Sequence, residues 1–277
     1  MEKRSLGSRL LAAPHLVWSA IFVVVPLIMV VYYSLSGTDG SFTLENLKQI
    51  PKYSDTFMLS IWLGLLATAI SLVLAYPLAY FISQSKFNVQ QTMIMLVMLP
   101  MWMNFLLRTY SWMTILENNG IINTILTSIG MQPLKLINTR GAVVLGMVYD
   151  FIPYMILPIY SVMVKLDHSL IEACEDLGGN RIDVFRRVIL PNSVSGVISG
   201  VTMVFVPSVS TFYISQKLGG TNTLLIGDVI ESQFMTSNNY HMGAALSLIL
   251  MVMILICLAV MNRFSGEDDI EQGRLAV

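Results

Sequence analysis

The run of residues 243–263, GAALSLILMVMILICLAVMNR, decides the fold class of this protein. It has no charged residue before Arg263. It is long enough to cross a membrane, because about 20 apolar residues at 1.5 Å each span a hydrocarbon core of ~30 Å. Similar windows cover about 14–35, 58–82, 92–116, 141–165 and 193–215. The sequence therefore predicts an all-α membrane protein of about six transmembrane helices.

The overall composition supports this interpretation. Of the 277 residues, 55% are hydrophobic and only 12% are charged, which is too apolar for an ordinary soluble domain. We found no repeat and no long linker, so residues 1–277 are expected to form a single transmembrane domain. The formal net charge of -1 gives no reason to expect a nucleic-acid partner. Cys174 and Cys257 fall in a predicted cytoplasmic loop and a membrane helix, so no extracellular disulfide is predicted.

The distribution of positive charge predicts the orientation. The first window follows Lys3, Arg4 and Arg9; a cleaved signal peptide is the competing interpretation, but the apolar stretch is long and no A-x-A site follows. With the N-terminus in the cytoplasm, ten of the 16 Lys and Arg residues lie inside, as the positive-inside rule favours. Both termini are then cytoplasmic. Isoleucines at helical spacing in 118–140 predict a short helix at the outer surface.

Motifs of enzyme chemistry are missing. There is no Gly-Lys-Ser or Gly-Lys-Thr of a phosphate-binding loop, no H-E-x-x-H and no G-x-S-x-G. The three histidines lie in separate segments. We therefore predict no catalytic residue, no metal site and no cofactor bound by this chain.

The hydrophilic segment 166–192 is highly patterned. Ser169 and Glu172 have the S-x-x-E spacing of a capping box, which predicts a short helix that ends at Gly178. Asn180 is placed to cap a second short helix, which Pro191 is expected to stop. Two short amphipathic helices joined by a glycine hinge could transmit a movement of a soluble partner to the membrane helices.

This segment carries a family resemblance. Glu172-Ala173-Cys174, Gly178 and Val188-Ile189-Leu190-Pro191 stand at the spacing of the EAA motif of ABC importer permeases, with Cys174 for Ala and Val188 for Ile as departures. The resemblance implies the type I importer permease fold and a loop that docks into a cleft of a cytoplasmic ATPase. The residues it assigns to ATPase coupling are Glu172, Ala173, Cys174, Gly178, Leu190 and Pro191.

The resemblance extends along most of the chain. It includes Leu99-Pro100, Arg108-Thr109-Tyr110, Leu157-Pro158-Ile159-Tyr160 and Leu224-Leu225-Ile226-Gly227. In these stretches the chain resembles the PotB type of spermidine/putrescine permease. This implies a prokaryotic plasma membrane, a polyamine substrate, a PotC-like second permease and a PotA-like ATPase dimer that uses ATP and Mg. It also implies a PotD-like solute-binding protein, received by the outer segments 36–57 and 216–242.

The residues offer a separate indication of the substrate. Asp150 lies within the fourth window, where a carboxylate costs roughly 2.5 to 3.5 kcal/mol to insert, so it should face a cavity or a cation. Tyr149, Tyr110, Trp112 and Tyr213 are expected at neighbouring heights, where their ring faces could hold ammonium groups. Two alternatives stay open: Asp150 pairs with Arg108 or with a partner subunit, and the aromatic residues form an interfacial belt.

Other functions also stay open. A permease for an amino acid derivative, a sugar, iron or thiamine would share much of this pattern. A self-sufficient channel or secondary carrier would need no ATPase.

Overall fold

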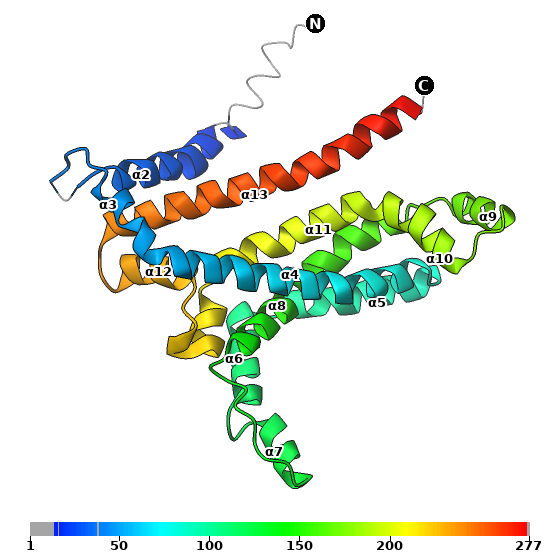
Figure 1. Ribbon diagram of the computed structural model, residues 1–277, viewed down its shortest axis with the longest axis horizontal. Helices are drawn as coiled ribbons and strands as arrows, with labels where there is room; N and C mark the ends of the chain where they lie inside the picture. Colours follow the sequence, from blue (N-terminus) through cyan, green and yellow to red (C-terminus); the bar gives the residue numbers. More distant parts are fainter. Residues whose placement is uncertain (1–13, 16, 38, 276–277) are drawn as a thin grey trace, which may run out of the picture. The chain divides into compact units, whose positions relative to one another are not determined.

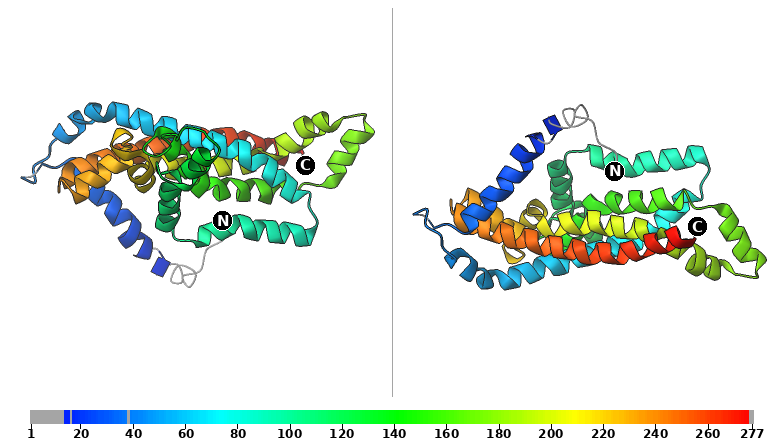
Figure 2. Two further views of the ribbon diagram at one scale, coloured as in Figure 1. Left: turned by 90° about the horizontal axis from the view of Figure 1, so that it is seen from below. Right: turned by 90° about the horizontal axis from the view of Figure 1, so that it is seen from above.

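The computed structural model describes residues 14–15, 17–37 and 39–275, and the basic segment with Lys3, Arg4 and Arg9 lies outside them (Figures 1 and 2). The described residues are helical apart from loops and one isolated bridge between Ser36 and Phe42. The long helices are α2 (Val25–Ser34), α4 (Ser54–Ser83), α5 (Phe87–Trp102), α6 (Phe105–Leu116), α8 (Arg140–Met163), α11 (Leu190–Ser210) and α13 (Tyr240–Leu275). The shorter helices are α3 (Glu45–Lys48), α7 (Ile121–Ser128), α9 (His168–Asp176), α10 (Arg181–Val184) and α12 (Ile226–Met235). π-helical turns occur at η1 (Ala20–Val24), η3 (Phe185–Ile189) and η4 (Ser215–Gly219), and 3-10 turns at η2 (Ile50–Tyr53) and η5 (Gly220–Asn222).

The chain divides into two compact units, one of Met1–Ser54 with Val229–Met253 and one of Asp55–Asp228 with Ile254–Val277. In the first unit, the His241 ring Nδ1 lies 3.2 Å from Ser36 Oγ and 3.2 Å from the Tyr33 carbonyl oxygen, which ties the end of α2 to the start of α13. The second unit holds every candidate site residue. The single domain expected from the sequence stays a prediction.

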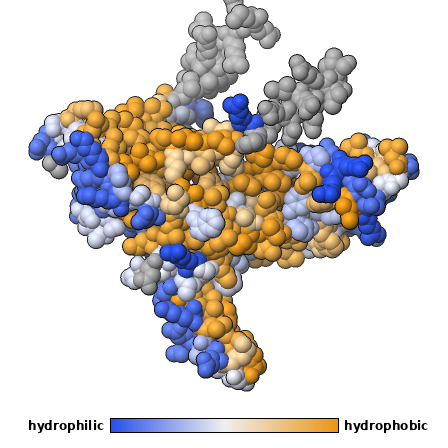
Figure 3. Space-filling model, in the orientation of Figure 1, coloured by the Kyte–Doolittle hydropathy of each residue, from blue (hydrophilic) through white to orange (hydrophobic). Residues whose placement is uncertain are grey.

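The expected fold class is confirmed. Within the described residues, five helical stretches are long and apolar enough to cross a membrane, and the bent stretch Phe87–Trp102 with Phe105–Ser128 makes a sixth if it counts as one span. Figure 3 shows hydrophobic surface over the middle of α4, and a mixture of hydrophilic and hydrophobic surface where α9 and α10 lie. The last helix, α13, continues to Leu275, beyond the predicted end at 263.

The prediction of one helix over 92–116 is wrong. The chain bends by 89° between α5 and α6. Met103 takes an extended conformation (φ -78°, ψ 147°), and the Asn104 side chain accepts a hydrogen bond from the Leu106 N–H at 2.8 Å, so α6 begins with its own N-cap. The mean hydropathy of a window does not register a cap of this kind, because one Asn changes the average little.

The prediction that Pro191 stops a helix is also wrong. The chain runs helically from Arg181 to Ser210 as one span. Pro191 is the second residue of α11. The π-helical turn η3 ends two residues before it, and the Leu190 N–H donates to the Phe185 carbonyl oxygen. Because the π turn shifts the hydrogen-bond register just before the proline, the missing N–H of Pro191 does not break the helix.

The core of the second unit is the close packing of α11 on α8. A Cβ added at Gly196 would lie 2.9 Å from the Pro158 carbonyl oxygen, and one at Gly200 would lie 3.1 Å from the Met155 carbonyl oxygen. The two glycines, four residues apart, form a small-residue face that lets the backbones approach. Met155 and Val204 are fully buried at this contact.

We expect Gly196→Ala to destabilise the protein by about 1–3 kcal/mol, because the added methyl group meets backbone that cannot move aside alone. Thermal unfolding of the purified protein in detergent measures the effect. The matched control is Gly141→Ala in α8, where a Cβ meets only Thr139 Oγ1 at 3.7 Å. Equal unfolding temperatures for the two variants would contradict the packing argument.

Candidate coupling loop and substrate pathway

The N-cap of helix α9 lies two residues earlier in the chain than the capping box predicted. Asp167 is the N-cap, and its Oδ1 accepts a hydrogen bond from the Ser169 N–H at 2.9 Å. The predicted role of Ser169 as N-cap is therefore wrong. An Asp N-cap accepts a hydrogen bond from the first turn, as a Ser N-cap does, and adds a negative charge at the positive end of the helix. Glu172 lies within the helix and is exposed.

Gly178 ends α9, as predicted. Its φ of +83° lies in the left-handed region. The Gly178 N–H donates to the Glu175 carbonyl oxygen and the Gly179 N–H to the Cys174 carbonyl oxygen, each at 2.9 Å. These are the two hydrogen bonds of a Schellman motif. Asn180 then caps α10 as predicted, with a capping box to Asp183.

The two short helices expose apolar side chains. Ile171 and Cys174 pack against the hydrophobic core of the unit. Leu177 is 90% exposed and Ile182 is 67% exposed. Ala173 is also exposed, beside Glu172. The loop therefore carries an apolar surface with a carboxylate next to it, which is the kind of surface that a protein partner covers.

The loop is tied to α4 as well as to α11. Phe185 makes an edge-to-face contact with Tyr76 of α4, with 5.8 Å between ring centroids. The Tyr76 hydroxyl lies 2.8 Å from Ser193 Oγ in the first turn of α11. Leu190, at 42% exposure, and the exposed Pro191 lie between these contacts. A displacement of the loop would therefore move two membrane helices.

Asp150 faces a cation, and the cation is Arg108. Asp150 Oδ1 lies 3.1 Å from Arg108 Nη1, and the side chains are 1% and 8% exposed. Of the alternatives left open by the sequence, the structure shows this pairing. Neither of these atoms, nor Arg108 Nε, has a hydrogen-bond partner among the described residues. The pair is held by charge and burial, and the carboxylate is closed to solvent in this chain.

The candidate aromatic residues form two separate pairs. Tyr110 and Tyr213 meet edge to face with ring centroids 6.1 Å apart. Trp112 and Tyr149 meet in the same manner at 5.2 Å. Lys217 Nζ lies 5.3 Å from the Tyr110 ring centroid and 5.7 Å from that of Tyr213. The sequence analysis did not predict that Lys217 joins this cluster.

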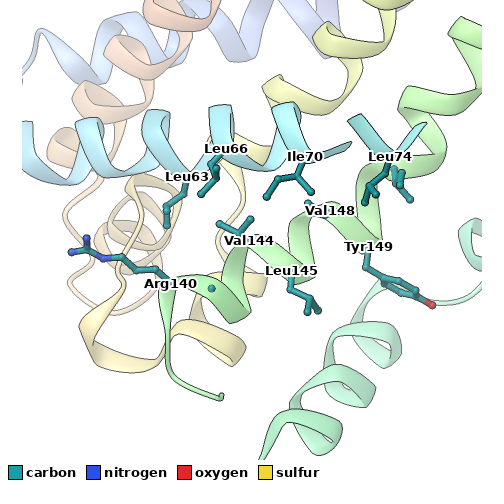
Figure 4. A pocket seen from close by; sticks show the side chains of 11 residues that line it. Leu63, Leu66, Ile70, Leu74, Arg140, Val144, Leu145, Val148 and Tyr149 are labelled. Carbon is teal, nitrogen blue, oxygen red and sulfur yellow. The ribbon is translucent and has the colours of Figure 1, made fainter. Parts of the chain in front are cut away.

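A groove of about 630 Å³ lies between α4 and α8 (Figure 4). Leu63, Leu66 and Ile70 line it from α4 and Val144 lines it from α8, with Arg140 at one end. Tyr149 also lines it from α8 and provides its one aromatic ring; apart from Arg140, the rest of the lining is hydrocarbon, without a carboxylate. Because a polycation needs several carboxylates or ring faces, only the Tyr149 ring of this groove belongs to our candidate substrate pathway.

Comparison with known proteins gives the family. The sequence profile described as "Binding-protein-dependent transport system inner membrane component" matches residues 87–265. The chain belongs to this family. As a member it is a multi-pass inner-membrane transport component and not a catalytic subunit.

Curated relatives of this permease family match nearly the whole chain. The spermidine/putrescine transport system permease protein PotB of Haemophilus influenzae is 38% identical over 256 residues, which is 89% of this chain and 90% of the relative. The protein of the same name from Escherichia coli K12 is 35% identical over 258 residues, 90% of this chain and 94% of the relative. The resemblance to the PotB type is thereby confirmed.

Solved structures agree on the permease fold. A bacterial ABC transporter that imports the acidic polysaccharide alginate matches with a TM-score of 0.77 at 17% identity, over 94% of both chains. A structure of the bacterial alginate transporter with its alginate pentasaccharide-bound periplasmic protein matches with a TM-score of 0.71 at 17% identity, over 93% of both chains. The importer permease fold expected from the sequence is confirmed.

We expect Asp150→Leu to destabilise this permease by about 3–5 kcal/mol, because it leaves the buried Arg108 charge without a partner. The double variant Arg108→Met/Asp150→Leu should recover most of that loss, since no buried charge remains. Thermal unfolding of both variants in detergent measures the difference. A double variant no more stable than the single one would show that the ion pair is not the cause.

Proposed function

We propose that this chain is the permease subunit of an ABC importer for spermidine and putrescine, and that it forms half of the translocation pathway. The observation that carries the proposal is the likeness, along nearly the whole chain, to relatives named as spermidine/putrescine permeases. The aromatic pairs support a cationic substrate, because ring faces attract ammonium groups. Asp150 supplies a carboxylate to the substrate only when it is released from Arg108.

The proposed partners follow from the missing chemistry and from the loop. A PotA-like ATPase dimer binds ATP and Mg and drives alternating access, while this chain binds no cofactor. A PotC-like permease forms the other half of the pathway, and a PotD-like solute-binding protein delivers the polyamine to the outer segments 36–57 and 216–242. Both termini of this chain then lie in the cytoplasm.

In this proposal the loop transmits the work of the ATPase. Its exposed apolar side chains become buried in the ATPase cleft, with Glu172 and Ala173 at the contact. Leu190 and Pro191 lie where the loop becomes α11, so they carry the displacement into the membrane.

In the same proposal the ring faces guide the substrate. Tyr110, Tyr213, Trp112 and Tyr149 receive its ammonium groups along the pathway. Asp150 takes part only in a state where Arg108 has moved away, because the two are paired and closed to solvent. The substrate therefore meets the rings before it meets the carboxylate.

Cells that lack their own polyamine uptake and express this chain with its proposed second permease, ATPase and solute-binding protein should take up labelled spermidine. Unlabelled putrescine should compete, and thiamine, sugars and amino acids should not. Failure of polyamines to compete with the labelled solute would overturn the substrate assignment. Flux through the chain reconstituted without any ATPase would overturn the importer itself.

We expect Glu172→Ala and Gly178→Ala to weaken association with the ATPase and to lower uptake. For Gly178 the effect should be about five- to thirtyfold, because a side chain in the left-handed conformation costs about 1–2 kcal/mol. Co-purification of the ATPase and spermidine uptake are the measurements.

Gly130 provides the matched control for Gly178. It ends α7 with φ +82° and the same pair of Schellman hydrogen bonds, from the Gly130 N–H to Thr127 and from the Met131 N–H to Leu126. Nothing lies within 4 Å of a Cβ built at either glycine. Gly130→Ala therefore carries the same backbone strain outside the loop and should leave ATPase association unchanged. Equal losses in the two variants would contradict the coupling role.

A further inference from the structure

An ammonium group already occupies the ring faces of the Tyr110–Tyr213 pair. It belongs to Lys217, whose Nζ lies 5.3 Å and 5.7 Å from the two ring centroids. Both distances are within the ~6 Å at which a cation is attracted to the face of an aromatic ring. The planes of the two rings are 80° apart, so they form two walls of a corner around this cation.

The turn that carries Lys217 is held in place from several sides. Leu218 is fully buried, and a Cβ added at Gly146 of α8 would lie 2.6 Å from its Cδ1. The Asn138 N–H donates to the Leu218 carbonyl oxygen at 2.9 Å. The Ser215 hydroxyl donates to Asp228 Oδ1 at 3.0 Å. The backbone of η4 is therefore fixed, and the position of the Lys217 ammonium follows from it.

The described neighbours of this ammonium are the two ring faces and the Tyr110 hydroxyl. The ion pairs found in the described part of the chain join Arg108 to Asp150 and Arg187 to Asp183, and neither pair includes Lys217. Tyr110 is 42% exposed, so the corner is also open to an incoming molecule. A site of this kind takes any alkyl ammonium that can reach it.

We infer that Lys217 is a built-in competitor of the substrate: its ammonium occupies the Tyr110–Tyr213 corner until an ammonium group of the passing substrate replaces it. The inference rests on the proposed function and adds a residue that sets the affinity of the pathway. The lysine stem is a four-carbon chain that ends in an ammonium, which has the chemistry of one end of a putrescine molecule. Two ammonium groups repel each other at contact, so the corner holds one of them at a time.

Replacement of Lys217 by an uncharged side chain should therefore tighten substrate binding. The complex that co-purifies with the tagged chain, freed of solute-binding protein, is titrated with labelled spermidine up to millimolar concentration. Lys217→Met should bind spermidine about five- to thirtyfold more tightly than the wild type, because the two ring faces are then free to bind a substrate ammonium. Lys217→Arg keeps a cation over the rings and should bind as the wild type does.

The rings provide the second arm of the test. In the Lys217→Met background, Tyr110→Leu should abolish the gain in affinity, whereas Tyr110→Phe should keep it, because the phenyl ring retains its face. Tyr110 is partly exposed, so these changes are compatible with folding. A lysine that serves only to hold the turn would give weaker or unchanged binding in Lys217→Met, and no dependence on the ring.

The outcomes separate this inference from the proposed function. If the complex transports spermidine but Lys217→Met binds it no more tightly than the wild type, or neither binds it, the role of Lys217 is overturned. If the wild-type complex transports no polyamine, the proposed function is overturned together with the inference. A gain in affinity that survives Tyr110→Leu would place the substrate elsewhere and overturn the competition at the rings.

Discussion

The absence of side chains at three glycines is the constraint on which the second unit depends. Gly196 and Gly200 let the backbone of α11 approach α8, and Gly146 leaves room for Leu218. Because van der Waals packing holds helices together where water is excluded, such close approach is what fixes their relative positions. Helix α8 carries Tyr149 and Asp150, and its contact with Leu218 positions the turn that carries Lys217.

The same contacts connect the coupling loop to the pathway. α11 continues without a break from α10 through the π turn η3, so the loop has no flexible joint on this side. The left-handed Gly178 lies within the loop, between α9 and α10. A displacement of α10 would therefore be transmitted directly to α11. Since α11 lies in close backbone contact with α8, the displacement reaches the helix of Asp150.

Hydrophobic length predicted the membrane helices because the cost of burying polar backbone in lipid acts on every spanning segment. It did not predict the bend at Asn104, the continuation through Pro191 or the cap at Asp167. Each of these features depends on one side chain or one backbone hydrogen bond, and the mean hydropathy of a window does not detect a single residue. The spacing of Glu172, Gly178 and Pro191 could still be recognised, because a motif depends on individual residues and not on a window average.

The candidate pathway shows a different limit. Chemistry alone indicated that Asp150 and the tyrosines suit a cation, but which cation they meet depends on contacts between distant parts of the chain. The fold supplies Arg108 to Asp150 and Lys217 to the rings. A transport pathway must bind its substrate firmly enough to admit it and weakly enough to release it. Under the proposed function, internal cations meet this condition at Asp150 and at the Tyr110–Tyr213 corner: there a substrate ammonium gains a partner only as a protein cation gives one up, so the net affinity stays low.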